Sequence, residues 1–176
     1  MKIKPPFNNT NYKLCNWLIS NYPEDYEEMA YLEPFGNSAA TLINKSPSAE
    51  ETINCIDADV LRTIRDQPKE FIANFKKSRG KKENIIKNIK AMSERLKHVY
   101  ILNKPVQEVI KAFDNKNTFS YVEVPPFGEI DMDIMELVKS LRGKVIVFSV
   151  YSTCYNRFFK GWRKICKNND ALWANY

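Results

Sequence analysis

The stretch TFSYVEVPPFGEIDMDIMELVKSLRGKVIVFSV, residues 118–150, decides the fold. Its first seven residues, 118–124, are rich in β-branched and aromatic side chains, which predicts a buried strand. A helix is predicted over 131–141 and ends before Gly143, as helices commonly do. The run KVIVFSV at 144–150 is the most apolar of the chain and predicts a central strand. Two strands joined by a helix indicate a parallel pair.

The same alternation of strand-like and helix-like spacing continues along the rest of the chain. Further strands are predicted at 29–33, 52–56, 99–102 and 171–175. Further helices are predicted at 12–20, 39–43, 59–65, 69–77, 82–96, 105–113 and 155–166. Because no internal repeat or low-complexity linker interrupts the pattern, residues 1–176 are interpreted as one α/β domain, with a mostly parallel sheet and helices on both faces. Such sheets bind ligands at the carboxyl ends of their strands, so the turns after Glu33, Ile56 and Val124 are candidate sites.

The charge, the cysteines and the apolar runs of the chain indicate which partners and sites to expect. The net charge of +6 is a mild indication of a polyanionic partner. Cys15, Cys55, Cys154 and Cys166 form no CxxC pair and His98 has no cysteine beside it, so neither a metal site nor a disulfide framework is expected. The N-terminal residues do not resemble a signal peptide, and no apolar run reaches the ~18 residues of a membrane span. We therefore expect a cytoplasmic protein without a membrane partner.

Five segments, in order along nearly the whole chain, carry a resemblance to a known family. They are PFNNTNYKLCNWLIS (6–20), YLEPFGNSAATLINKSPS (31–48), KAMSERLKHVYILNKPVQEVIKAFDNKNTFSYVEVPPF (90–127), GKVIVFSVYSTCYNRFFKGWRKI (143–165) and LWANY (172–176). With these segments the chain resembles the Dam-like class of adenine-specific DNA methyltransferases. The resemblance implies a Rossmann-like methyltransferase fold and a site for S-adenosylmethionine.

At the cofactor site, several positions depart from the family's pattern. The positions that the resemblance implies are Asn11, Glu33, Phe35, Gly36, Asn37, Cys55 and Asp57. Asn11 replaces the family's lysine, and Asn37 replaces a turn glycine, a change that the tolerance of Asn for a left-handed backbone makes survivable. Cys55 replaces the family's ribose-binding aspartate, and a thiol is a weak acceptor. Asp57 is expected on the same strand face, about 6–7 Å further out. No bound cofactor is therefore expected.

The family's catalytic motif places Asp, Asn or Ser before Pro-Pro and an aromatic residue, and here it reads Val124, Pro125, Pro126 and Phe127. In the family, the polar side chain and a neighbouring backbone carbonyl accept hydrogen bonds from the amino group of a flipped adenine, on which the aromatic ring stacks. Phe127 can stack, but Val124 accepts no hydrogen bond. Strand alternation is expected to send Glu123 to the opposite face. The motif is interpreted as degenerate.

A shortened basic insert at about 71–97 stands where the resemblance places the family's target-recognition region. Nine basic residues in 76–97 oppose only Glu83 and Glu94. The candidate nucleic-acid-binding residues are Lys76, Lys77, Arg79, Lys81, Lys82, Lys87 and Lys90, and Arg95 and Lys97 complete the set. A second basic cluster, Arg157, Lys160, Arg163, Lys164 and Lys167, accompanies Phe158, Phe159 and Trp162. Basic side chains interleaved with aromatic ones favour non-specific nucleic-acid binding, with a solvated helix face as the alternative.

Neutral residues at cofactor and catalytic positions favour a pseudoenzyme, a Dam-like protein that binds nucleic acid or a protein partner without transferring a methyl group. By association, a small decayed methylase fits a phage or other mobile element that acts on host defence inside a bacterial cell. Two alternatives stay open. The chain is an active N6-adenine methyltransferase that uses S-adenosylmethionine in a divergent site, or it is a structural subunit beside an active methylase.

Overall fold

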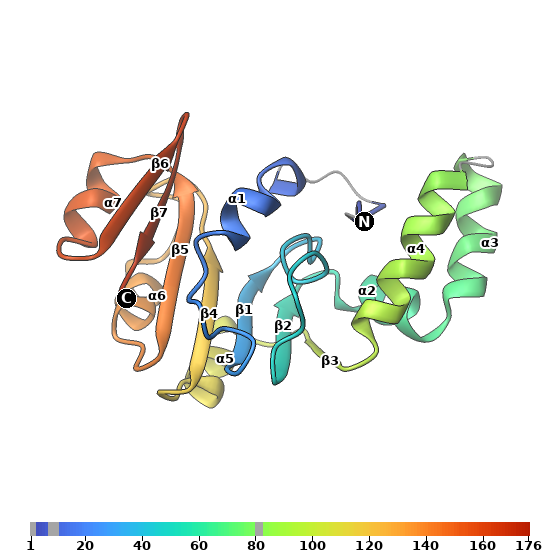
Figure 1. The fold of residues 1–176 in the computed structure, drawn as a ribbon, viewed down its shortest axis with the longest axis horizontal. Helices are drawn as coiled ribbons and strands as arrows, with labels where there is room; N and C mark the ends of the chain where they lie inside the picture. Colours follow the sequence, from blue (N-terminus) through green and yellow to red (C-terminus); the bar gives the residue numbers. More distant parts are fainter. Residues whose placement is uncertain (1–2, 7–10, 80–82) are drawn as a thin grey trace.

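Seven strands form one sheet in the order β3-β2-β1-β4-β5-β7-β6 (Figure 1). The computed structural model describes residues 3–6, 11–79 and 83–176. The strands are β1 (Ala30–Gly36), β2 (Glu50–Cys55), β3 (Val99–Leu102), β4 (Thr118–Glu123), β5 (Lys144–Val150), β6 (Arg163–Lys167) and β7 (Asp170–Ala174). The first five strands pair in parallel, and β7 runs antiparallel to both β5 and β6. The predicted mostly parallel sheet is confirmed.

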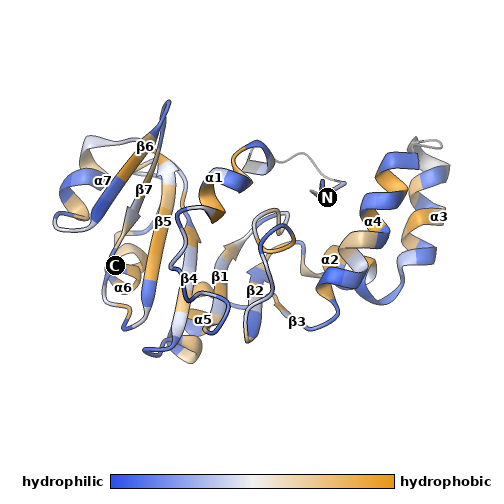
Figure 2. Ribbon diagram, viewed as in Figure 1, coloured by the Kyte–Doolittle hydropathy of each residue, from blue (hydrophilic) through white to orange (hydrophobic). Residues whose placement is uncertain are grey.

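Two separate apolar cores lie against this sheet, as expected when helices cover both faces. The helices are η1 (Asn11–Lys13), α1 (Cys15–Ile19), α2 (Ala58–Asp66), α3 (Pro68–Arg79), α4 (Glu83–Leu96), α5 (Val106–Phe113), α6 (Met132–Lys139) and α7 (Thr153–Phe158). One core joins α1, α2, α3 and α4 to the sheet, and the other joins α5, α6 and α7. The strand β5 is apolar along most of its length (Figure 2), which agrees with its predicted central position.

The predicted helix over 155–166 is wrong. The helix α7 ends at Phe158, and residues 163–167 form the edge strand β6 instead. Gly161 has a φ of +94°, a conformation that side chains penalise and that an α-helix cannot contain. Phe159 is 1% exposed, so its ring packs inside the protein at this turn. The basic side chains of Arg163, Lys164 and Lys167 are exposed on the strand. Three residues of the second basic cluster, Arg163, Lys164 and Lys167, therefore lie on an edge strand, while Arg157 lies on α7 and Lys160 in the turn between them.

The predicted helix over 39–43 is also wrong, because this segment forms a series of turns. Two hydrogen bonds of helical spacing form, from the Ile43 amide to the Ala39 carbonyl and from the Lys45 amide to the Thr41 carbonyl, but no regular helix develops. Ala39 has a φ of +56°, which blocks helical continuation from the preceding turn. The left-handed residue expected at Asn37 is thus Ala39, two positions later.

Among the residues that the structure describes, every helix is too short or too polar to cross a bilayer. The same residues contain no group of three His, Cys, Asp or Glu side chains placed to hold a metal ion.

Candidate functional site

A cleft of about 640 Å³ opens at the carboxyl edge of the sheet, where β1, β2, β3 and β4 end. Its lining residues are Pro34, Phe35, Gly36, Asn37, Asn54, Cys55, Ile56, Asp57, Asn103, Lys104, Val106, Glu123, Val124 and Pro125. We call it the first cleft. It brings together most of the positions that the sequence assigned to a cofactor site, and it lies where open parallel sheets bind ligands.

Phe35, Gly36 and Asn37 line the first cleft as the sequence predicted. At Gly36, an added Cβ would lie 2.3 Å from the Cγ1 of Ile53 and 3.0 Å from the carbonyl oxygen of Asn54. Glycine is therefore required here because β1 passes close to β2, whatever the cleft holds. Of the remaining cofactor positions, Glu33 does not line the cleft, and the side chain of Asn11 lies outside the described residues.

The end of β2 carries the thiol of Cys55 at the edge of the first cleft. Cys55 is 4% exposed, and burial, together with the charges of Glu33 and Asp57, raises the pKa of its thiol to about 11. Asp57 is not on the strand as expected, because β2 ends at Cys55 and Asp57 is the exposed N-cap residue of α2. The carboxylate that lines the cleft beside this strand end is therefore that of Asp57, at the N-terminus of α2, and not a side chain of β2.

Sequence reasoning gave no role to several residues that line the first cleft, Asn54 among them. The Asn54 side chain donates to the carbonyls of Pro34 and Lys104, both at 3.1 Å, and accepts from the Lys104 amide at 2.9 Å. It therefore fixes the ends of three adjacent strands, and a buried Asn inside an apolar strand was the available signal. Ile56 is 90% exposed beside the cleft, which gives the lip an apolar surface.

A second cleft of about 560 Å³ adjoins the first and shares Glu123, Val124 and Pro125 with it. Its other lining residues include Lys13, Leu14, Phe148, Ser149 and Asp170. Glu123 was expected on the face opposite Val124, but both residues line both clefts. Alternation stops there because β4 ends at Glu123. A carboxylate therefore stands at the boundary between the two clefts.

In the motif at 124–127, the backbone groups of Val124 and Pro125 form hydrogen bonds within the protein. Val124 is 5% exposed, and its amide donates to the Phe148 carbonyl at 3.0 Å. The Pro125 carbonyl accepts hydrogen bonds from the Tyr155 hydroxyl at 2.8 Å and from the Ser149 hydroxyl at 3.1 Å. Both lone pairs of this carbonyl are thus engaged within the protein. Phe127 is 37% exposed and contacts the Tyr155 ring edge to face, with centroids 5.1 Å apart.

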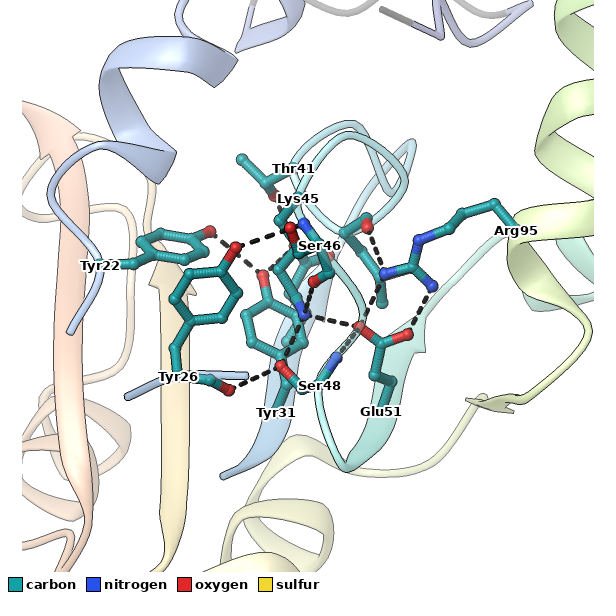
Figure 3. Close-up of polar contacts among 11 residues, drawn as sticks. Tyr22, Tyr26, Tyr31, Thr41, Lys45, Ser46, Ser48, Glu51 and Arg95 are labelled. Atoms are coloured by element: carbon teal, nitrogen blue, oxygen red, sulfur yellow. Dashed lines mark hydrogen bonds and ion pairs between the residues drawn. The ribbon is translucent and has the colours of Figure 1, made fainter. Parts of the chain in front are cut away.

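Glu33 is buried and belongs to a polar network with Tyr22, Tyr31 and Thr41, three residues that Figure 3 labels. Its Oε1 accepts hydrogen bonds from the Tyr31 hydroxyl at 2.6 Å and from the Thr41 hydroxyl at 2.5 Å. The Tyr22 and Tyr31 hydroxyls lie 3.2 Å apart. Burial raises the pKa of Glu33 to about 7, although both hydroxyl donors act in the opposite direction. Glu33 therefore holds the turns at 39–45 and is not exposed to a ligand.

An adjacent ionic cluster joins the same turns to α4 (Figure 3). Glu51 accepts from Lys45 at 2.5 Å and from the Arg95 guanidinium at 2.5 and 2.7 Å. Arg95 also donates to the Leu42 carbonyl at 2.9 Å. Burial lowers the pKa of Lys45 to about 8. Burial alone would raise the pKa of Glu51, but the hydrogen bond from Arg95 and the Lys45 charge hold it below its ordinary value.

The basic insert is an α3–α4 hairpin (Pro68–Leu96), in which the two helices contact each other and also α2 (Figure 1). Lys76, Lys87 and Lys90 are exposed on it, as a nucleic-acid surface requires. The Arg95 counted with them is half-buried and bound to Glu51, and Lys97 pairs with Glu94 at 2.6 Å. Lys81 and Lys82, and the side chains of Lys77 and Arg79, lie outside the described residues.

The chain resembles known proteins in its structure. No family model matches it, and no curated protein matches its sequence. Its structure is similar to that of a putative methyltransferase, yhhF, from Escherichia coli, with a TM-score of 0.52 at 13% identity over 98% of this chain and 86% of that one. The chain has a methyltransferase fold.

Two further solved structures support the same fold. The rRNA methyltransferase aviRa from Streptomyces viridochromogenes is similar with a TM-score of 0.56 at 11% identity, over 97% of this chain and 86% of that one. The precorrin-6y C5,15-methyltransferase from Geobacter metallireducens GS-15 is similar with a TM-score of 0.55 at 13% identity, over 92% of this chain and 86% of that one. At such identities the likeness concerns the arrangement of the chain and not a shared substrate.

Proposed function

We propose that this methyltransferase-fold protein is a degenerate Dam-like enzyme that transfers no methyl group and acts by binding nucleic acid through the α3–α4 hairpin. The loss of methyl transfer rests on one observation, the hydrogen bonding of the Pro125 carbonyl. It is hydrogen-bonded to Ser149 and Tyr155, and it lies beside an apolar Val124. An amino group entering the second cleft at this point would meet neither of the two acceptors that the family's chemistry uses.

The loss of cofactor binding is supported by the neutral Cys55 at the end of β2. Buried polar ligand groups need fixed partners, and a protonated thiol is a weak one. Isothermal calorimetry with S-adenosylmethionine tests the loss of cofactor binding directly. We expect no binding at physiological cofactor levels, and a dissociation constant in the low micromolar range would contradict it.

The Val124→Asp variant separates a single lost contact from a decayed site. If both the cofactor and the catalytic positions are degenerate, restoring one carboxylate leaves transfer of labelled methyl groups to DNA undetectable. Methylation of adenine by this variant would mean that the cofactor site is functional and that our interpretation of Cys55 is wrong.

The proposal that the protein binds nucleic acid is supported by the exposed lysines on the α3–α4 hairpin. If three to five cations contact phosphates, raising salt from 50 to 200 mM should weaken duplex binding roughly 40- to 500-fold. The double variant Lys87→Gln/Lys90→Gln should lower both the affinity and the salt slope in an anisotropy titration. The matched control is Lys111→Gln/Lys116→Gln, which removes two exposed charges near α5. No binding at 50 mM salt, or equal effects of the two pairs, would refute a role for the hairpin.

A second candidate, an active methyltransferase with a divergent site, is favoured by one observation. Glu123 lines both clefts, so a carboxylate could accept a hydrogen bond from a substrate amino group next to Val124. If this holds, the wild-type protein transfers labelled methyl groups to nucleic acid and Glu123→Gln loses this activity. Absence of transfer by the wild-type protein removes this candidate.

A further inference from the structure

The two edge strands of the sheet, β3 and β6, differ in whether side chains bind their outward backbone groups. At the β3 edge, the Arg62 guanidinium donates to the Ile101 carbonyl at 2.8 and 3.3 Å. The Arg65 guanidinium donates to the Val99 carbonyl at 3.1 Å. Side chains of α2 thus occupy backbone acceptors that an incoming strand would need, and the β3 edge is protected against strand addition.

The β6 edge has no such protection among the described residues. On β7, the Asn175 amide bonds the Val145 carbonyl, and the Asn169 carbonyl accepts from the Tyr151 amide, so odd-numbered positions face β5. Even-numbered positions therefore face β6, where Leu172 pairs with Ile165. By the same alternation, the backbone groups of Lys164 and Cys166 point away from β7. None of the hydrogen bonds found within residues 3–6, 11–79 and 83–176 reaches them.

The β6 side chains give this edge a strong positive charge. Arg163, Lys164 and Lys167 occupy three of its five positions, and none of the ion pairs of the described chain involves them. Each lies over an aromatic ring, Tyr176 at 5.4 Å, Tyr151 at 5.4 Å and Trp17 at 5.6 Å from the ring centroid. A second copy of the same edge would be repelled, because like charges on neighbouring strands destabilise pairing.

We propose that the β6 edge binds an extended acidic peptide segment of a partner protein, which adds to the sheet as an eighth strand. The partner's backbone pairs with Lys164 and Cys166, and its carboxylates lie near the three cations. A nucleic-acid strand fits this edge less well, because phosphates accept hydrogen bonds but donate none to the two outward carbonyls. This surface is separate from the α3–α4 hairpin, which lies at the other end of the sheet (Figure 1).

The experiment uses the full chain and a fluorescent heptapeptide of alternating Glu and Val. We expect it to bind at least about tenfold more tightly than the matching Lys and Val peptide. Methylating the peptide's amides at alternate positions, on the edge that pairs, should weaken binding about tenfold, the loss expected for one or two net hydrogen bonds. Amide exchange at Lys164 and Cys166 should slow when the acidic peptide is added, while exchange at Tyr100 on β3 stays unchanged.

Two protein variants separate backbone pairing from simple charge attraction. Cys166→Pro keeps every charge and removes one outward N–H, which edge strands tolerate, and it should weaken peptide binding about tenfold. Lys164→Gln keeps the backbone and should weaken binding less at high salt than at low salt. If Cys166→Pro and the methylated peptide bind as well as their parents, the edge attracts polyanions without strand addition and the proposal is overturned. Preferential binding of an oligo-dT strand to this edge would also overturn it.

Discussion

Replacing Glu33 by Gln should change how the stability of the protein depends on pH. Glu33 is 3% exposed, and burial raises its pKa from the ordinary 4.5 to about 7. The folded state therefore holds the proton more tightly than the unfolded state does. The stabilisation from the protonated carboxyl is fully present below about pH 4.5 and is lost as the pH rises through about 7.

The size of this effect follows from the interval between the two pKa values. At about 1.4 kcal/mol per pH unit, the interval from 4.5 to about 7 corresponds to about 3 kcal/mol of unfolding free energy. The Gln amide does not ionise, and its oxygen can still accept from Tyr31 and Thr41. Relative to wild type, Glu33→Gln should therefore gain about 2–3 kcal/mol between pH 5 and pH 8.

Urea unfolding followed by circular dichroism at several values between pH 5 and pH 8 measures this difference. The control is Glu27→Gln, which removes a carboxylate from an exposed position outside the network. If the wild-type and Glu33→Gln curves run parallel over this range, Glu33 is ionised in the folded protein at pH 5. The account of the buried network would then be wrong.

Three other substitutions test the packing and the ionic cluster. Glu51→Gln leaves the fully buried Lys45 ammonium without its carboxylate and should cost about 3–5 kcal/mol in urea unfolding. A loss below 1 kcal/mol would mean that Lys45 is uncharged or hydrated. Gly36→Ala forces a Cβ against Ile53 and should cost about 1–3 kcal/mol, seen as a lower melting temperature, and an unchanged value would contradict the close approach of β1 to β2. Phe159→Ala should cost about 3–5 kcal/mol, because this ring stacks on Tyr155 in the second core, and a loss typical of an exposed residue would place the ring outside that core.

Predictions from the sequence were correct where the spacing of apolar residues and the length of the segment indicate the same type of element. The strands at 99–102 and 144–150 were predicted with the bounds that the structure has, because each is a short apolar run between turn residues. The helix predicted at 155–166 failed because apolar and basic side chains in RFFKGWRKICK fit a helical face as well as a turn followed by an edge strand. Only Gly161 favoured the second interpretation, and a lone glycine decides little.

The position of the first cleft could be predicted because its residues follow the ends of adjacent parallel strands. The sequence predicted Phe35, Asn37 and Cys55 at the cleft, and the structure places all three there. Long-range partners were not predictable, since nothing in the chain near Arg95 indicates that it reaches Glu51, 44 residues away. For the same reason, the engagement of the Pro125 carbonyl by Tyr155 could not be foreseen.

The contact between Arg95 and Glu51 joins the α3–α4 hairpin to the rest of the domain, so the hairpin is not an independent module. Arg95 ends the hairpin inside the domain, where it supports Leu42 and the carboxylate that also holds Lys45. A chain with the hairpin excised would therefore lose one of the two counterions of Glu51 and the hydrogen bond to the Leu42 carbonyl. Grafting the hairpin onto another scaffold would separate Arg95 from Glu51 and from the Leu42 carbonyl. The hairpin is thus an integral part of the domain, joined through Arg95 to β2 and to the turns at 39–45.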